Sequence, residues 1–187
     1  DEARKRVQDL RHENDAIVVG GNTASTDNPS LTDRSGKPRR RDLIRVVLDN
    51  RLRIPLDSML VSSAIETPTI VFSNSTDEEK VETLFRHGVQ VPRIDARDLN
   101  AVLDGLRKRG IQSILVEGGG EVAGAFVDAK LLDKVTFIIG PMIIGGHSAP
   151  TSIGGKGAVS LAEAFRLSDI EVKSLGEELE ITGYPTK

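Results

Sequence analysis

The stretch Ile114-Leu115-Val116-Glu117-Gly118-Gly119-Gly120 carries the strongest structural signal in the chain. An apolar run reaches three glycines, and helix-compatible residues follow them. Glycines let backbone N–H groups approach a ligand closely, and the N-terminus of a helix favours an anion. Gly118, Gly120 and Ala123 also satisfy the loose G-x-G-x-x-A pattern, although no acidic strand end follows about 20 residues later, as it does in a conventional Rossmann domain. The stretch therefore favours an α/β fold with a phosphate or dinucleotide loop here, over a tight turn that binds nothing.

Apolar strand-like runs and helical stretches alternate around this junction. The expected strands are residues 16–19, 44–48, 69–72, 114–116 and 135–139, and their continuous apolar character suits strands buried on both faces. The expected helices are residues 1–13, 77–87, 98–109 and 120–130, with Thr76 as an N-cap. We expect a polar loop from Gly20 to about Asp42, and a closing antiparallel hairpin over residues 165–184 around Gly176. The fold class is therefore α/β, with a mostly parallel mixed sheet.

Composition narrows the class of protein. The 187 residues suit one domain, and 25 basic against 28 acidic residues give no field that would favour nucleic acid or an anionic membrane. There is no cysteine, and the three histidines lack metal-ligand spacing, so no metal site is expected. No apolar run approaches a membrane span and the start does not resemble a signal peptide, which favours a cytoplasmic enzyme or binding protein.

Three loops are further candidates. Gly20-Gly21-Asn22-Thr23 leaves a strand at its C-terminal end, where open α/β sheets bind ligands, and Asp27-Asn28-Pro29 is typical of a turn. Gly145-Gly146-His147-Ser148-Ala149-Pro150-Thr151 is either a flexible crossover or a lid. The basic run Lys37-Pro38-Arg39-Arg40-Arg41 is either a solvated loop or an attraction for a phosphorylated ligand.

Several segments occur together in one order along the chain. They are Asp15-Ala16-Ile17-Val18-Val19-Gly20, Thr23, Asp27-Asn28-Pro29-Ser30-Leu31-Thr32, Arg45-Val46-Val47-Leu48-Asp49, Arg53-Ile54-Pro55, Val116-Glu117-Gly118-Gly119 and Pro141-Met142-Ile143-Ile144-Gly145-Gly146. In this order they resemble the riboflavin-pathway reductases, which comprise the C-terminal domain of the bifunctional bacterial deaminase-reductase and its stand-alone archaeal and fungal relatives. The resemblance covers nearly the whole chain.

The resemblance implies a dihydrofolate-reductase-like three-layer fold, a homodimer and NADPH as cofactor. It implies reduction of the ribosyl C1′ of 2,5-diamino-6-ribosylamino-4(3H)-pyrimidinone 5′-phosphate to a ribitylamino product, because the chain has no zinc deaminase signature and stand-alone members act before deamination. The alternatives are the 5-amino-6-(5-phosphoribosylamino)uracil substrate, a pterin reductase of the same fold, and a non-catalytic nucleotide-binding domain.

The resemblance also implies the residues of the site. Those expected to bind the cofactor are Thr23, Asp27, Asn50, Gly118, Gly119, Gly120, Glu121, Val122, Ala123 and Gly124. Those expected to bind the substrate are Arg11, Leu31, Arg34 and Glu117, with the two arginines matched to the 5′-phosphate. No residue is assigned as the catalytic group.

The chain departs from the family pattern at three places. Asn50 stands where relatives usually carry serine, and Gly21-Asn22 alters a glycine triplet before Thr23. The family also opens with a strand and an Asn-x-Ala-x-Ser-x-Asp-Gly-type motif, and both would lie before Asp1. We therefore expect residues 1–187 to be a single reductase domain that lacks the family's N-terminal strand.

Overall fold

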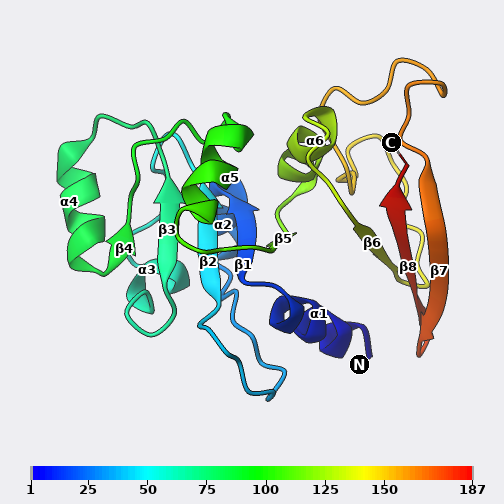
Figure 1. Cartoon of the computed structure of the whole chain (residues 1–187), viewed down its shortest axis with the longest axis horizontal. Helices are drawn as coiled ribbons and strands as arrows, with labels where there is room; N and C mark the ends of the chain where they lie inside the picture. Colours follow the sequence, from blue (N-terminus) through cyan, green and yellow to red (C-terminus); the bar gives the residue numbers. More distant parts are fainter. Residues whose placement is uncertain (1, 187) are drawn as a thin grey trace. The chain divides into compact units, whose positions relative to one another are not determined.

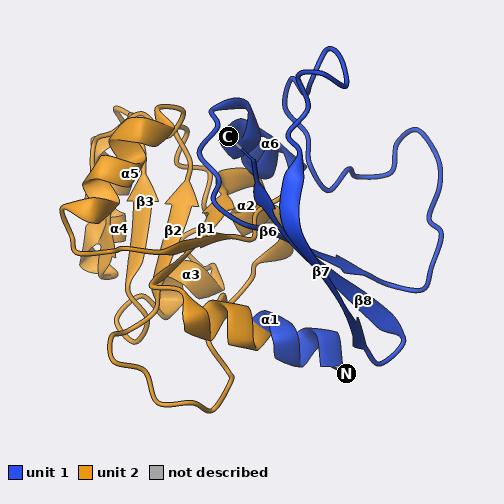
Figure 2. Ribbon diagram, turned by 45° about the vertical axis from the view of Figure 1, so that its right-hand side comes forward, with its two compact units in different colours: residues 1–7, 120–187 blue, residues 8–119 orange. Residues whose placement is uncertain are grey.

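The computed structural model describes residues 2–186 (Figure 1). They belong to two compact units (Figure 2). One unit consists of residues 8–119, and the other of the described residues within 1–7 and 120–187. The first helix, α1 (Glu2–Glu13), contributes to both units. None of the helices within residues 2–186 combines the length and the apolar character that crossing a membrane requires.

The unit of residues 8–119 is built on a five-stranded, fully parallel sheet. Its strands lie in the order β4-β3-β2-β1-β5. They are β1 (Ala16–Gly20), β2 (Ile44–Leu48), β3 (Thr69–Phe72), β4 (Val89–Gln90) and β5 (Ile114–Val116). Val18 of β1 pairs with Val46 on one side and with Val116 on the other. The four strands predicted in this unit are confirmed, and only the two-residue β4 was too short to be noticed.

Helices cover both faces of this sheet. On one face, Ile17, Val47 and Val71 belong to a buried cluster that includes side chains of α2 (Gly21–Asp27), α3 (Met59–Ser62) and α4 (Glu78–Arg86). Phe72 points to the opposite face because side chains alternate along a strand. There, Gly105 of α5 (Leu99–Arg107) lies against its ring. The result is the expected helix–sheet–helix arrangement.

The other unit holds α6 (Gly120–Asp128) and a separate antiparallel sheet in the order β6-β8-β7. Its strands are β6 (Val135–Ile139), β7 (Leu167–Leu175) and β8 (Glu178–Pro185). The predicted hairpin around Gly176 is confirmed, and Gly176 has the positive φ (67°) of a tight turn. The strand at residues 135–139 is confirmed too, but it pairs antiparallel with β8 and none of its residues is fully buried. A short apolar run alone does not reveal its neighbours in the sheet.

Two local expectations were wrong, and one short helix was not predicted. The polar loop expected from Gly20 begins as the seven-residue helix α2, whose polar sequence lacks an apolar stripe. The short helix α3 was not predicted. Helix α4 is capped by Asp77, whose side chain accepts a hydrogen bond from the Lys80 backbone N–H at 3.0 Å, and not by Thr76. Both residues are good caps, so composition alone did not distinguish them.

Candidate functional site

The chain order of the parallel sheet reverses at the β1–β5 pair. From β1 the chain continues to β2, β3 and β4 on one side, and then returns to place β5 on the other side. Open α/β sheets bind ligands outside the carboxyl ends of the strands at such a switch point. The chain leaves β1 into residues 21–23 and leaves β5 into residues 117–119. Two loops that were predicted independently as ligand sites therefore start at the same edge of the sheet.

The two loops are in direct contact. The Glu117 backbone N–H donates to the Val18 carbonyl at 3.1 Å. A Cβ atom added at Gly118 would lie only 2.7 Å from the Val19 Cα. Gly118 is therefore required by the close approach of the two strand ends. A Cβ added at Gly119 would meet only Thr23 Oγ1, at the ordinary distance of 3.4 Å, and Gly119 is exposed. Packing within the chain thus explains Gly118 and leaves Gly119 unexplained.

The remaining glycines of the predicted pyrophosphate loop lie in α6, within the other unit. Cβ atoms at Gly120 and Gly124 would collide with the backbone of residues 151–155. The Gly154 N–H donates to the Gly120 carbonyl at 2.7 Å, and the Asp128 carboxylate accepts the backbone N–H groups of Lys156 and Gly157. Residues 154–157 are therefore fastened to α6. Of the other predicted contacts in α6, Glu121 is exposed, whereas Val122 and Ala123 are half-buried.

Arg11 and Glu117, both predicted to bind substrate, form a two-pronged ion pair. Arg11 Nε lies 2.9 Å from Glu117 Oε1, and Arg11 Nη2 lies 2.7 Å from Glu117 Oε2. Arg11 Nη1 donates to the Thr32 carbonyl at 3.0 Å. The side chains of Arg11 and Glu117 are only 12% and 18% exposed. A fork of this kind fixes the carboxylate geometrically, so Glu117 is held as an oriented acceptor at the end of β5.

The two other predicted substrate residues differ in their accessibility. Leu31 is 4% exposed, belongs to the core cluster and has a positive φ of 46°. Its side chain is therefore directed into the protein, and only its main chain remains for a ligand. Arg34 is exposed, and among residues 2–186 no partner is found for its guanidinium group, although its backbone N–H donates to Gln8 Oε1 at 2.7 Å. Gln8 thus holds the backbone of Arg34, while its guanidinium is exposed and has no partner within the described part of the chain.

The predicted cofactor residues Thr23 and Asp27 both lie in α2, immediately after β1. Thr23 is half-buried beside Gly119, and Asp27 is exposed at the end of the helix. Asn28 ends α2 in the left-handed conformation (φ 43°), and its side chain accepts the backbone N–H of Met59 at the start of α3. The segment predicted as a turn at Asp27-Asn28-Pro29 therefore begins as the last residue of α2 and leaves the helix at Asn28.

Asn50, which was also predicted to bind the cofactor, is hydrogen-bonded to the loop that follows β4. Its amide nitrogen donates to Asp95 Oδ1, and its oxygen accepts the Ala96 N–H at 2.7 Å. Hydrogen bonds from the Arg97 backbone and from Asn50 lower the pKa of Asp95. Because both ends of the amide are engaged, the evident role of Asn50 in this structure is to hold the loop that follows β4.

Sequence reasoning missed the residue that joins the loop after α2 to the segment that runs from α3 to β3. Arg45 of β2 is completely buried and donates to the Ser30, Leu60, Ser63 and Thr67 carbonyls and to the Ser63 and Thr69 hydroxyls. Burial lowers the pKa of Arg45 and outweighs the attraction of Glu66, which raises it. The resulting pKa of about 10 keeps Arg45 charged at neutral pH. The sequence could have revealed this role, because Arg45 stands inside an otherwise apolar strand. An arginine is rarely buried unless its donors are satisfied.

Comparison with known proteins places this arrangement in context. The family model described as RibD C-terminal domain matches residues 1–181. The riboflavin biosynthesis protein RibD of Actinobacillus pleuropneumoniae is 36% identical over 181 residues, which are 95% of this chain and 48% of that protein. The 2,5-diamino-6-ribosylamino-4(3H)-pyrimidinone 5′-phosphate reductase of Methanothermobacter thermautotrophicus is 35% identical over 190 residues, covering 100% of this chain and 87% of that protein.

A solved structure agrees with these sequence relatives. Acinetobacter baumannii RibD (form 2) is similar with a TM-score of 0.82 and 25% identity, over 99% of this chain and 51% of that one. The chain thus spans about half the length of the two RibD proteins and most of the archaeal reductase.

Proposed function

The chain belongs to the RibD C-terminal domain family, and from this premise we propose that it reduces the ribosyl C1′ of 2,5-diamino-6-ribosylamino-4(3H)-pyrimidinone 5′-phosphate with NADPH. The observation that carries the proposal is the meeting of the two loops at the β1–β5 switch point, with Thr23 beside Gly119 and Glu117 next to Gly118. The archaeal relative that carries this substrate in its name is matched over most of its length, which supports the same substrate here.

The residues at the switch point fit a dinucleotide. No contact among the described residues requires a glycine at position 119. The missing side chain leaves the space that a pyrophosphate needs in order to approach the backbone. We assign the cofactor to Gly119 and Gly118, with Thr23 and Asp27 as polar partners, and retain residues 120–124 as further contacts. The chemistry that NADPH supplies when bound is a hydride for the C=N carbon of the ring-opened sugar. The protein contributes orientation and binding.

The substrate residues take different roles in this proposal. Glu117, oriented by the Arg11 fork, accepts hydrogen bonds from hydroxyl or amino groups of the substrate. Because Arg11 already holds Glu117 and the Thr32 carbonyl, we assign the 5′-phosphate to the free guanidinium of Arg34. This changes the expectation that both arginines bind the phosphate directly.

A spectrophotometric assay of NADPH oxidation tests the function. We expect turnover with the diaminopyrimidinone phosphate, slower turnover with the corresponding uracil and none with a pterin. NADH in place of NADPH checks the cofactor preference. Turnover with the pterin alone, or NADPH binding without turnover of any of the three compounds, contradicts the proposal.

The first prediction concerns the phosphate. Arg34→Ala should raise the Michaelis constant for the phosphorylated substrate about ten- to a hundredfold, because a charge-assisted hydrogen bond contributes about 1.5–3 kcal/mol. Affinity for NADPH should stay nearly unchanged. Arg34→Lys should restore binding only partly, since lysine lacks the two-pronged geometry. The control is Arg40→Ala, which removes the same charge from an exposed position in the same loop. A dephosphorylated substrate should be used equally well by wild type and Arg34→Ala, and equal losses on both substrates would remove Arg34 from the site.

The second prediction concerns assembly. We propose that residues 1–187 are a single reductase domain that forms a cytoplasmic homodimer. Ile170 and Val172 of β7 and Leu179 of β8 are 58%, 60% and 41% exposed, which leaves an apolar strip on the antiparallel sheet. Analytical ultracentrifugation at micromolar concentration should give twice the mass of one chain. A monomer under these conditions contradicts the dimer.

A further inference from the structure

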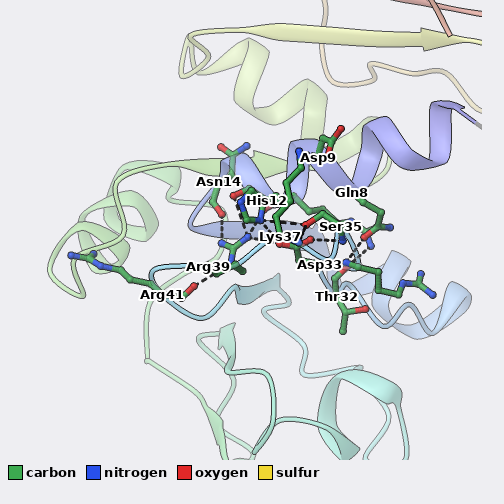
Figure 3. Close-up of polar contacts among 12 residues, drawn as sticks. Gln8, Asp9, His12, Asn14, Thr32, Asp33, Ser35, Lys37, Arg39 and Arg41 are labelled. Atoms are coloured by element: carbon green, nitrogen blue, oxygen red, sulfur yellow. Dashed lines mark hydrogen bonds and ion pairs between the residues drawn. The ribbon is translucent and has the colours of Figure 1, made fainter.

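Residues 32–39, called the strap below, run along the part of α1 that lies within the unit of residues 8–119 (Figure 3). Their contacts are distributed along the strap. They are Thr32 O with Arg11 Nη1 at 3.0 Å, Asp33 Oδ2 with His12 Nδ1 at 2.9 Å, Arg34 N with Gln8 Oε1 at 2.7 Å, and Lys37 Nζ with Asp9 Oδ1 at 2.7 Å. The strap is therefore fastened to the helix on both sides of Arg34.

Asp33 is the centre of this network. Its side chain is only 6% exposed and accepts hydrogen bonds from His12 Nδ1, Arg39 Nη1 and the Ser35 backbone N–H, each at 2.9 Å. Burial alone raises the pKa of Asp33. The bonds from the backbone and side chain of Ser35, from Arg39 and from His12 outweigh this effect and hold the pKa well below its usual value. Asp33 is thus ionised, and its carboxylate holds Ser35, His12 and Arg39 in place around Arg34.

Arg39 extends the network to the end of α1. Its guanidinium donates to the carbonyls of Arg11 at 3.0 Å, His12 at 3.2 Å and Asn14 at 2.7 Å. The last carbonyls of a helix have no partner within the helix, and a cation is favoured at that end. Asp33 therefore holds the residue that caps the helix turn carrying Arg11.

The basic run has a structural explanation as well. Lys37 is paired with Asp9, Arg39 caps α1, and Arg41 Nη1 donates to the Gly110 carbonyl at 2.8 Å. The run lies in a loop, and Lys37, Arg40 and Arg41 are exposed, in keeping with the interpretation as a solvated loop, whereas Arg39 is half-buried against the end of α1. Arg34 precedes this run in the same loop, and the described residues offer no partner for its guanidinium.

We propose that Asp33 is a positioning residue for recognition of the substrate phosphate. It fixes the backbone on both sides of Arg34, through the bond from the Ser35 backbone N–H and the pairs with His12 and Arg39. The inference rests on the proposed function, because it assumes that Arg34 meets a phosphate. Prior ordering of the backbone reduces the freedom that Arg34 loses on binding, and a displacement of about 1 Å in such a group lowers efficiency strongly.

Steady-state kinetics of Asp33→Asn test the inference. The substitution keeps the shape of the side chain and removes its charge. We expect the Michaelis constant for the phosphorylated substrate to rise about tenfold, with turnover number and NADPH affinity nearly unchanged. Efficiency on the dephosphorylated substrate should equal that of wild type. Asp98→Asn is the matched control, because Asp98 also accepts a backbone N–H, that of Ala101 at 3.0 Å, but caps α5.

A double substitution separates positioning from general damage. In the Arg34→Ala background, Asp33→Asn should have no further effect on phosphate discrimination, whereas a loss of general stability would add to both substrates. Equal losses on both substrates, or wild-type kinetics for Asp33→Asn, would overturn the inference. Should Asp33→Asn not fold, Gln8→Ala removes only the bond to the Arg34 backbone and should change discrimination in the same direction by a smaller factor.

A measurement without turnover distinguishes this inference from the proposed function. Amide hydrogen exchange at Arg34 and Ser35 should accelerate in Asp33→Asn, and affinity for ribose 5-phosphate should fall about tenfold relative to wild type. If wild type lacks turnover but these two changes occur, the proposed function fails and the positioning role stands. If wild type turns over and neither change occurs, the positioning role fails alone.

Discussion

Gly119→Val is expected to abolish measurable NADPH binding while the chain stays folded. The first side-chain carbon at position 119 would meet only Thr23 Oγ1, at 3.4 Å, so the protein itself accommodates it. The branched side chain would instead occupy the space that the pyrophosphate requires beside the strand-to-helix junction. Each charge-assisted hydrogen bond that the pyrophosphate loses would cost about 1.5–3 kcal/mol, so exclusion of the whole group should lower the affinity by more than about a hundredfold. Calorimetric titration with NADPH measures the loss, and circular dichroism checks the fold.

The neighbouring glycine supplies the control. Gly118→Ala should destabilise the protein, because its Cβ would lie 2.7 Å from Val19 Cα and 2.9 Å from Gly20 N, and backbone atoms of a buried strand do not move aside easily. A lower melting temperature for Gly118→Ala, together with a normal melting temperature for Gly119→Val, is the expected pattern. Unchanged NADPH affinity in folded Gly119→Val would contradict the cofactor assignment.

Arg45→Met should destabilise the protein by about 3–5 kcal/mol, because each buried acceptor that is left without a donor costs about 1–3 kcal/mol. Methionine fills much of the volume but leaves four carbonyls and two hydroxyls without the donors that Arg45 provides. The measurement is the free energy of unfolding from urea titration. Arg45→Lys should recover only part of the loss, since one ammonium group cannot reach all of these acceptors.

A surface arginine serves as the reference for Arg45. Arg86 lies on α4 with 68% of its side chain exposed and pairs with Glu82 one turn earlier. Arg86→Met should leave the free energy of unfolding almost unchanged, because exposed ion pairs contribute little. If Arg45→Met were as harmless as Arg86→Met, the six hydrogen bonds of Arg45 would not be essential to the fold.

The sequence predicted the parallel strands well because each is a continuous apolar run beside glycine or polar residues. It also predicted that the loops after β1 and β5 are ligand sites, since their glycines stand where strands end. It did not reveal helix α2, because a polar seven-residue helix carries no periodic signal. The place of β6 was missed for a related reason. An apolar run indicates a strand but does not identify its partner.

Contacts between distant residues were beyond reach of the sequence. Arg11 and Glu117 were each predicted to bind substrate, and nothing in their spacing showed that they bind each other. The same holds for Arg39, whose place in a basic run suggested solvent or phosphate and not the end of α1. Long side chains with several donors satisfy whatever acceptors the fold brings near, and this depends on tertiary structure alone.

The order of strands also has a consequence for how the protein is made. As the chain emerges during synthesis, β2, β3 and β4 add successively to one side of β1, whereas Val116 of β5 pairs with Val18 only after the intervening segment has been completed. Until then the other edge of β1 stays unpaired, and such edges are prone to associate with other chains. The loops of the switch point are therefore the last part of the parallel sheet to come together. A ligand that binds them would act late in folding and would favour the completed sheet by mass action.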